Sequence, residues 1–157
     1  MMKALVAYFS ASGMTAGPAK RLAEVLGAPV YEIRPAAPYT PADLDWTNKK
    51  SRSTLEMQDK NARPALADNH APVKGADIIF IGYPVWWYRE PSIIDSFLAA
   101  YDFSGKKIAL FATSGGSDIG TEAPARAAEI SKAEILGAKR FPVSVSADAL
   151  KAWAESL

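Results

Sequence analysis

The sequence predicts an α/β fold, a doubly wound three-layer sandwich built on a five-stranded parallel sheet in the order 2-1-3-4-5, with helices on both faces. Three continuous apolar runs, at residues 4–9, 78–83 and 108–112, are short and do not alternate, as is typical of strands covered on both faces. Two weaker strand candidates, residues 29–33 and 140–145, contain proline, which favours edge strands. They are the second and fifth strands, which are the edges in this order.

Helical patterns lie between these strands, and such alternation predicts this class of fold. A helix that starts near Thr15 has apolar residues at i, i+3, i+4 and i+7, and Gly27 is suited to end it. Pro91 is expected to open a second helix. Residues 121–134 are rich in alanine and predict a third, and an apolar stripe over residues 150–157 predicts a closing helix.

The connection over residues 35–75 is the least regular part of a chain that we expect to form one domain over residues 1–157. It contains five prolines and many charges, and its residues 48–61 are compatible with an exposed helix. About forty residues exceed the usual length of a connection, and such long connections are often functional or mobile.

Composition narrows the function classes. The chain has 157 residues, 49% of them hydrophobic and 22% charged, with a formal net charge of +1. This composition is typical of a globular protein. A net charge this small does not produce the positive electrostatic field that sequence-independent nucleic-acid binding needs. The absence of cysteine and the single histidine argue against disulfides, iron–sulfur clusters and multi-histidine metal sites. No apolar run has the length of a membrane span, so we expect a cytoplasmic protein.

The segment "SASGMT" (residues 10–15) joins the first strand to the first helix, where backbone amides and the helix dipole favour an anion. Ser10, Ser12 and Thr15 add hydroxyl groups, and Gly13 lets the backbone approach a ligand. Ordinary helix capping would also use Ser or Thr, so phosphate binding and capping both remain open. A Walker loop, a dinucleotide fingerprint and a receiver-type acidic site are excluded by the residues present.

Two further segments follow the third and fourth strands. "YPVWWY" (residues 83–88) places three adjacent large rings in a loop, more than a core can absorb, which suits stacking on a planar aromatic ligand. "TSGGSDIG" (residues 113–120) has paired glycines that let backbone amides approach a flat ligand edge. All three segments lie at carboxyl ends of adjacent strands, where open α/β sheets bind ligands.

Together these segments resemble the flavodoxin family, whose members bind flavin mononucleotide (FMN) noncovalently. "SASGMT" resembles the family's phosphate loop, and "YPVWW" and "TSGGSDIG" resemble its two ring-binding loops. A further pattern in the connection (Arg52, Glu56, Arg63, Pro64) resembles a bacterial flavodoxin-like subfamily. The resemblance implies FMN as cofactor, no metal site, and no catalytic side chain. The cofactor-binding residues that it implies are Ser10, Ser12, Gly13, Met14, Thr15 and Ala16 for the phosphate, Pro84, Val85, Trp86, Trp87 and Tyr88 for the ring, and Thr113, Ser114, Gly115, Gly116, Ser117 and Gly120 for the pyrimidine edge.

Two features depart from the family pattern. Flavodoxin carriers are generally acidic, whereas this chain has a net charge of +1. They also usually place a ring on each flavin face, whereas "TSGGSDIG" offers none, so one face is open or is covered by Tyr39, Trp46 or another part of the connection.

The resemblance implies an oxidoreductase-type flavoprotein that transfers electrons through FMN to a redox partner protein, with no nucleic-acid or membrane partner, acting as a monomer or homodimer. An alternative is an NAD(P)H-dependent reductase acting on a small quinone-like acceptor. A flavin-free binding module is the second alternative.

Overall fold

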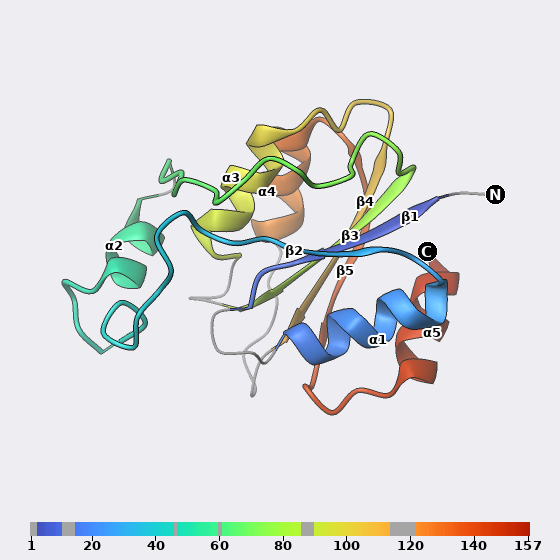
Figure 1. Cartoon of the computed structure of the whole chain (residues 1–157), viewed down its shortest axis with the longest axis horizontal. Coiled ribbons are helices and arrows are strands. Elements are labelled where there is room, and N and C mark those ends of the chain that lie inside the picture. Colours follow the sequence, from blue (N-terminus) through green and yellow to red (C-terminus); the bar gives the residue numbers. More distant parts are fainter. Residues whose placement is uncertain (1–2, 11–14, 46, 60, 86–89, 114–121) are drawn as a thin grey trace.

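The computed structural model of the chain describes residues 3–10, 15–45, 47–59, 61–85, 90–113 and 122–157. A parallel sheet lies between two layers of helices (Figure 1). The sheet has the strand order β2-β1-β3-β4-β5. The predicted fold class and strand order are therefore confirmed.

Each of the five strands runs parallel to its neighbours. Their bounds are β1 (Ala4–Tyr8), β2 (Val30–Glu32), β3 (Ile78–Pro84), β4 (Lys107–Thr113) and β5 (Glu134–Phe141). In the centre of the sheet, Val6 of β1 lies opposite Val30 of β2 on one side and Phe80 of β3 on the other. The chain leaves β1 toward β2 and leaves β3 toward β4, so the topological switch point lies between β1 and β3.

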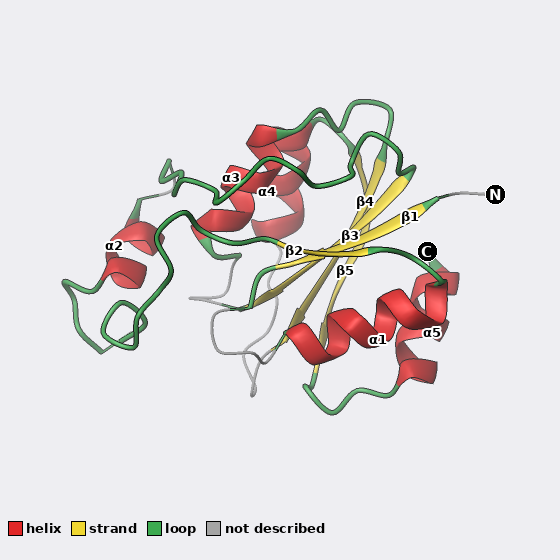
Figure 2. Ribbon diagram, in the orientation of Figure 1, coloured by secondary structure: helices red, strands yellow, loops and turns green. Residues whose placement is uncertain are grey.

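The described helices separate into two pairs and one outlier (Figure 2). Their bounds are α1 (Ala16–Leu26), α2 (Arg52–Gln58), α3 (Ser92–Ala100), α4 (Glu122–Ser131) and α5 (Ala147–Ser156). Helices α1 and α5 cover one face of the sheet, α3 and α4 cover the other, and α2 lies in the long connection, away from the strands. No described helix combines the length and apolar character needed to cross a membrane.

Helix ends follow local signals. Gly27 ends α1 in the left-handed conformation, with φ 62°, which glycine adopts without the steric cost that a Cβ brings. Pro91 stands at the N-cap of α3, and the Ser146 side chain caps α5 by accepting a hydrogen bond from the Ala149 amide. Two predictions are therefore confirmed: Gly27 ends α1, and Pro91 opens the helix that is labelled α3.

Both faces of the central strands are buried. Leu5 and Ala7 belong to the core beneath α3 and α4, whereas Val6 and Tyr8 belong to the core beneath α1 and α5. This explains why β1 is a continuous apolar run without alternation.

The fifth strand and the helix before it differ from the sequence prediction. β5 is Glu134–Phe141, not residues 140–145, and α4 ends at Ser131. Lys132 has φ 62°, so the chain turns there and frees the following apolar residues for the sheet. Pro142 lies just beyond the strand, because its missing N–H cannot serve the ladder.

The connection over residues 35–75 contains α2, but its helix is not exposed on all sides. Ser53, Thr54 and Met57 are buried, while Leu55 is 53% exposed. An isolated bridge between Pro35 and Leu66 closes the connection on itself. A helix therefore does form within residues 48–61, but only one side of it is exposed, because the other side is buried.

Candidate functional site

The carboxyl ends of β1, β3 and β4 meet at one edge of the sheet. The Phe9 amide donates to the Gly82 carbonyl oxygen at 2.9 Å, and the Val85 amide donates to the Thr113 carbonyl oxygen at 3.1 Å. These bonds extend the pairing one residue beyond the strands. The residues that follow β1, β3 and β4 are thus held side by side at the switch point.

Thr15 ties the first of these ends to the third. Its Oγ1 lies 2.8 Å from Oγ1 of Thr113, and both side chains are almost completely buried. The Thr15 amide donates to Oγ of Ser10 at 3.3 Å. Thr15 stands at the N-cap of α1 but makes no side-chain cap hydrogen bond, so ordinary capping does not explain its hydroxyl.

The start of α1 is electrostatically suited to an anion. Ala16 begins the helix, and the first turn contains no acidic residue, so the positive end of the helix dipole is not neutralised there. Arg21, further along α1, donates to the carbonyl oxygens of Val143 and Val145 at 2.8 and 3.1 Å. Its guanidinium therefore fixes the chain between β5 and α5.

Two residues of the segment predicted to contact the flavin ring are described, and both lie at the same edge. Pro84 is opposite Thr113 in the register of β3 and β4. Val85 is half-buried and packs against the core beneath α3 and α4. The structure therefore brings six of the predicted site residues together: Ser10, Thr15, Ala16, Pro84, Val85 and Thr113. The others lie outside the described residues: Ser12, Gly13, Met14, Trp86, Trp87, Tyr88, Ser114, Gly115, Gly116, Ser117 and Gly120.

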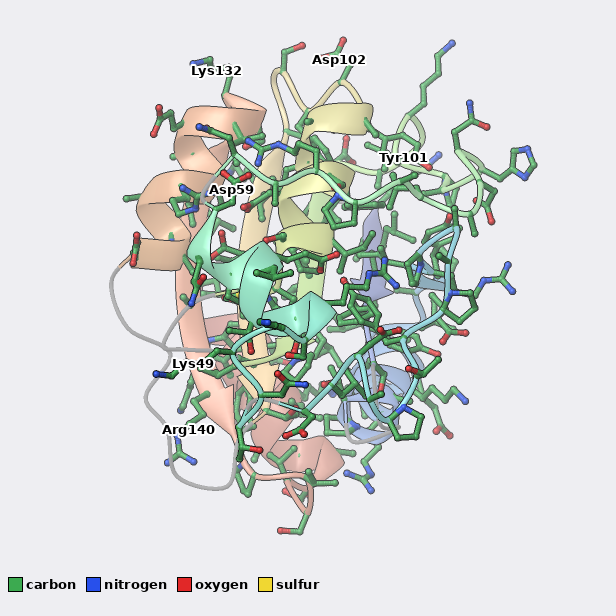
Figure 3. The ribbon with its side chains drawn as sticks, turned by 90° about the vertical axis from the view of Figure 1, so that its left-hand side faces the viewer. Lys49, Asp59, Tyr101, Asp102, Lys132 and Arg140 are labelled. Carbon is green, nitrogen blue, oxygen red and sulfur yellow. The ribbon has the colours of Figure 1, made fainter. Side chains whose placement is uncertain are left out.

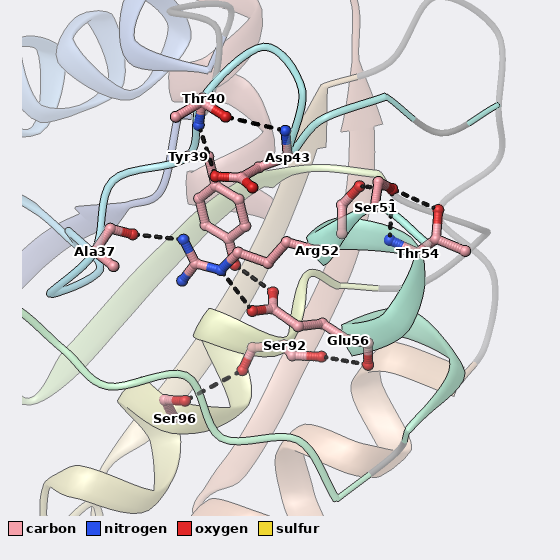
Figure 4. Close-up of polar contacts among 11 residues, drawn as sticks. Ala37, Tyr39, Thr40, Asp43, Ser51, Arg52, Thr54, Glu56, Ser92 and Ser96 are labelled. Carbon is pink, nitrogen blue, oxygen red and sulfur yellow. Dashed lines mark hydrogen bonds and ion pairs between the residues drawn. The ribbon is translucent and has the colours of Figure 1, made fainter. Parts of the chain in front are cut away.

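Tyr39 of the long connection lies against Arg52 and Glu56 of α2 (Figure 4). Its ring meets the Phe9 ring edge-on, with 5.7 Å between centroids, and the Arg52 guanidinium carbon lies 3.9 Å from its centroid. The Tyr39 hydroxyl donates to Glu56, and Arg52 bonds Glu56 at 3.0 Å and the Ala37 carbonyl oxygen at 2.6 Å. Burial and the bond to Glu56 raise the pKa of Tyr39. Trp46, the other ring considered for the flavin face, lies outside the described residues.

A cavity of about 370 Å³ adjoins Ser10 at the carboxyl ends of β1 and β2. Its lining includes the aromatic residues Phe9 and Tyr39 and the charged residues Glu32 and Arg34. It lies beside the predicted phosphate loop, on the side of the β2 edge.

A buried cluster of charges lies beneath the same edge, and the sequence motifs do not predict it. Nε of Arg126 bonds Oε1 of Glu90 at 2.9 Å, and its Nη2 bonds Oδ2 of Asp95 at 2.6 Å. Glu90 and Asp95 are 2% and 1% exposed. Burial, followed by the hydrogen bond and charge of Asp95, raises the pKa of Glu90 to about 8.

The signals for this cluster are visible in the sequence in hindsight. Glu90 directly precedes Pro91, where the chain turns inward, and Asp95 interrupts the apolar stripe of α3. Arg126 is the only basic residue of α4. Buried charges of this kind require partners, but no spacing rule links three residues on separate elements.

The molecular face on which α2 lies carries charges of both signs. Lys49, Asp59 and Arg140 are all exposed there (Figure 3). Their mixture agrees with the near-zero net charge of the chain.

Comparison with known proteins identifies the family. A family model described as flavodoxin matches residues 3–157. A candidate flavoprotein from Bacteroides eggerthii is 40% identical, with a TM-score of 0.92 over 99% of this chain and 98% of that one. One from Bacteroides uniformis is 41% identical, with a TM-score of 0.91 over 98% of each.

More distant structures share the fold. A flavoprotein from Lactobacillus acidophilus, solved in complex with FMN, is 20% identical, with a TM-score of 0.70 over 98% of this chain and 99% of that one. No curated protein sequence matches the chain. The family match over residues 3–157, on a sheet of the order β2-β1-β3-β4-β5, means that this chain belongs to the flavodoxin family.

Proposed function

We propose that this protein binds FMN noncovalently at the edge formed by β1, β3 and β4, and that it transfers electrons through it. The observation that carries this proposal is the buried pair of hydroxyl groups of Thr15 and Thr113, 2.8 Å apart. It joins the predicted phosphate loop to the end of β4 without serving as a helix cap.

The described residues fit the phosphate of FMN. The N-terminus of α1 offers a helix dipole that no first-turn carboxylate offsets. Ser10 accepts from the Thr15 amide at 3.3 Å, so its own hydroxyl hydrogen is available for a phosphate oxygen. Hydroxyls and amides suffice to anchor a phosphate that is held and not transferred, and residues 10–17 contain no lysine or arginine.

The ring of FMN would lie over the ends of β3 and β4. Pro84 and Val85 begin the segment predicted to contact it, and Thr113 begins the segment predicted to meet its pyrimidine edge. Bound FMN supplies reversible electron acceptance, while the protein supplies orientation and electrostatics. The side chains at this edge hold the cofactor, and none of them is assigned a proton-transfer step.

A titration of the purified apo-protein with FMN tests this proposal through flavin absorbance and fluorescence. Thr15→Val removes a hydroxyl and keeps the side-chain shape, and we expect it to weaken FMN binding at least about tenfold, the size of a lost hydrogen bond to a charged group. Thr15→Ser is the matched control and should bind nearly as well as the natural protein. A folded protein that binds no FMN would overturn the proposal and leave the flavin-free binding module.

The cavity beside Ser10 favours a second candidate, an NAD(P)H-dependent reductase. At about 370 Å³ it is large enough for a small flat acceptor such as a quinone. Anaerobic addition of NADH or NADPH to the FMN-loaded protein separates the two. Rapid bleaching of the flavin would select the reductase, whereas inertness toward both nucleotides would select the carrier that serves a redox partner protein.

A further inference from the structure

The buried cluster of Glu90, Asp95 and Arg126 joins segments that are far apart in the sequence. Glu90 lies in the chain between β3 and α3, Asp95 lies in the first turn of α3, and Arg126 lies on α4. Arg126 reaches one oxygen of each carboxyl, at 2.9 and 2.6 Å. One guanidinium therefore joins the chain that follows β3 to the helix that follows β4.

The position of these residues relates them to the candidate site. Glu90 follows the segment over residues 84–88 that is predicted to contact the flavin ring. Arg126 lies four residues after Glu122, the start of α4, which follows the segment over residues 113–120 predicted to contact the pyrimidine edge. The Glu90–Arg126 bond thus joins the chain just before α3 to α4, while the Val85–Thr113 bond at 3.1 Å joins the ends of β3 and β4.

The charges of the cluster explain how two carboxyls tolerate one another in a buried place. Arg126 faces both, Arg63 of the long connection lies 3.9 Å from Oδ2 of Asp95, and the phenol of Tyr83 on β3 is close enough to be affected by the charges of both carboxyls. Glu90 and Asp95 hydrogen-bond each other, which two carboxyls do only when one of them carries a proton.

We propose that Glu90 and Arg126 are positioning residues of the flavin site, and that one proton shared by the Glu90 and Asp95 carboxyls lets Arg126 bond both of them and so fasten the start of α3 to α4. This inference rests on the proposed function.

The shared proton links FMN binding to pH. FMN bound at this end of the sheet would bring a phosphate dianion and an apolar ring toward the cluster, and both would disfavour the ionised form of Glu90, so that the bound state would hold the proton more tightly than the free state. FMN affinity must then fall as the pH rises through the pKa of Glu90, about 8 in the protein without FMN. The phosphate itself titrates near pH 6 and is already a dianion in this window.

The test is an FMN titration at pH 7 and pH 9. For the natural protein we expect binding about tenfold weaker at pH 9, the value for a proton held only in the bound state with a free-state pKa of about 8. Glu90→Gln puts a neutral amide in place of the protonated carboxyl. The FMN affinity of this variant should be the same at pH 7 and at pH 9. Glu129→Gln, an exposed carboxyl on the same helix as Arg126, is the matched control and should keep the tenfold change.

Positioning by Arg126 has its own readout. Arg126→Lys keeps the positive charge but not the two-pronged geometry, so we expect weaker FMN binding and an altered flavin absorption band at pH 7. An unaltered band with unchanged affinity would overturn the positioning role.

A direct readout does not need FMN. Carbon NMR of the side-chain carboxyls in the apo-protein should show one Glu carbon that titrates near pH 8 and that is absent in Glu90→Gln. A Glu90 carbon that titrates below pH 6 would overturn the shared proton, whether or not the variants fold. Loss of FMN binding at every pH would sink the proposed function, whereas binding that is equal at pH 7 and pH 9 would sink only this inference.

Discussion

At the scale of single residues, a pair of buried hydroxyl groups joins the start of α1 to the end of β4. Thr15 and Thr113 are 0% and 1% exposed and each uses the other as a hydrogen-bond partner. A buried polar group that loses its partner costs more than the bond itself contributes. The pair therefore serves the fold as well as the proposed phosphate site, and its two roles can be separated by measurements on the apo-protein.

Thr15→Val and Thr113→Val should each destabilise the apo-protein by about 1–2 kcal/mol, because each leaves one buried hydroxyl without its partner. The double variant should cost less than the sum of the two, with a coupling of about 1 kcal/mol. Urea unfolding of the four proteins measures this cycle. Strict additivity would mean that the hydroxyl pair contributes nothing to stability.

A second residue-scale prediction concerns Gly82 in β3. A Cβ at this position would lie 2.2 Å from Cζ of Phe111, so the Phe111 ring fills the space that a side chain would need. Gly82→Ala should destabilise the protein by about 1–3 kcal/mol or more through overpacking. Combining it with Phe111→Leu should recover part of this loss, and thermal unfolding of the single and double variants tests the rescue.

At the scale of elements, the short helix of the long connection depends on contacts with other parts of the chain. α2 has seven residues, too few for a helix that is stable alone, so its order depends on tertiary contacts. Arg52 supplies two of them, to the Ala37 carbonyl oxygen and to the Tyr39 ring, and it also bonds Glu56 within the helix. The Ser92 hydroxyl of α3 donates to the Glu56 carbonyl oxygen at 3.1 Å.

Arg52→Ala should loosen this connection without unfolding the sheet. We expect the local opening free energy of the α2 amides to fall by about 1–2 kcal/mol, the sum of a partly buried ion pair and a cation–π contact. Native-state hydrogen exchange of residues 52–58 measures the change. Arg34→Ala is the control, because the Arg34 side chain is 61% exposed and lies 3.5 Å from Asp68. Equal protection in both variants would contradict the prediction.

The elements also show where sequence reasoning succeeds. β1, β3 and β4 were found because strands buried on both faces have uninterrupted apolar runs. β5 was misplaced because its exposed edge leaves a weaker pattern, and the turn at Lys132, with φ 62°, has no glycine to signal it. The order of strands was nevertheless correct, since Pro29 and Pro142 flank the edge strands and not the central ones.

The residues around the candidate site also fall into those that the sequence predicts and those that it does not. Ser10, Thr15 and Thr113 belong to contiguous motifs, which sequence spacing can show. Glu90, Asp95 and Arg126 meet only because α3 and α4 cover the same face of the sheet. Their contact depends on how α3 and α4 pack. Many core residues together determine that packing, so no single motif in the sequence predicts the contact.

At the scale of the whole molecule, the buried carboxyl of Glu90 makes stability depend on pH. Its pKa is about 8 in the folded protein against an ordinary value of 4.5, so the folded state binds more protons between these values. The contribution of Glu90 to stability is therefore present in full below about pH 4.5 and is lost as the pH rises to about 8. Other carboxyls with lowered pKa, such as Asp68, act in the opposite sense at lower pH.

We expect the free energy of unfolding of the apo-protein to decline from pH 6 to pH 8.5, and Glu90→Gln to flatten that decline. Urea unfolding across this range provides the measurement, with Glu129→Gln as the control that keeps the decline. A natural protein whose stability rises over the same range would contradict the assignment.

The central pairing of the sheet also has a kinetic consequence. Lys3 and Asp77, at the start of the contact between β1 and β3, are 74 residues apart in the sequence, and Thr15 and Thr113 are 98 apart. Contacts of such long range form late, because loop closure must precede them. The proposed FMN site therefore does not exist on a partly synthesised chain. FMN should bind only after folding is complete, so added FMN would slow unfolding and leave the rate of folding unchanged.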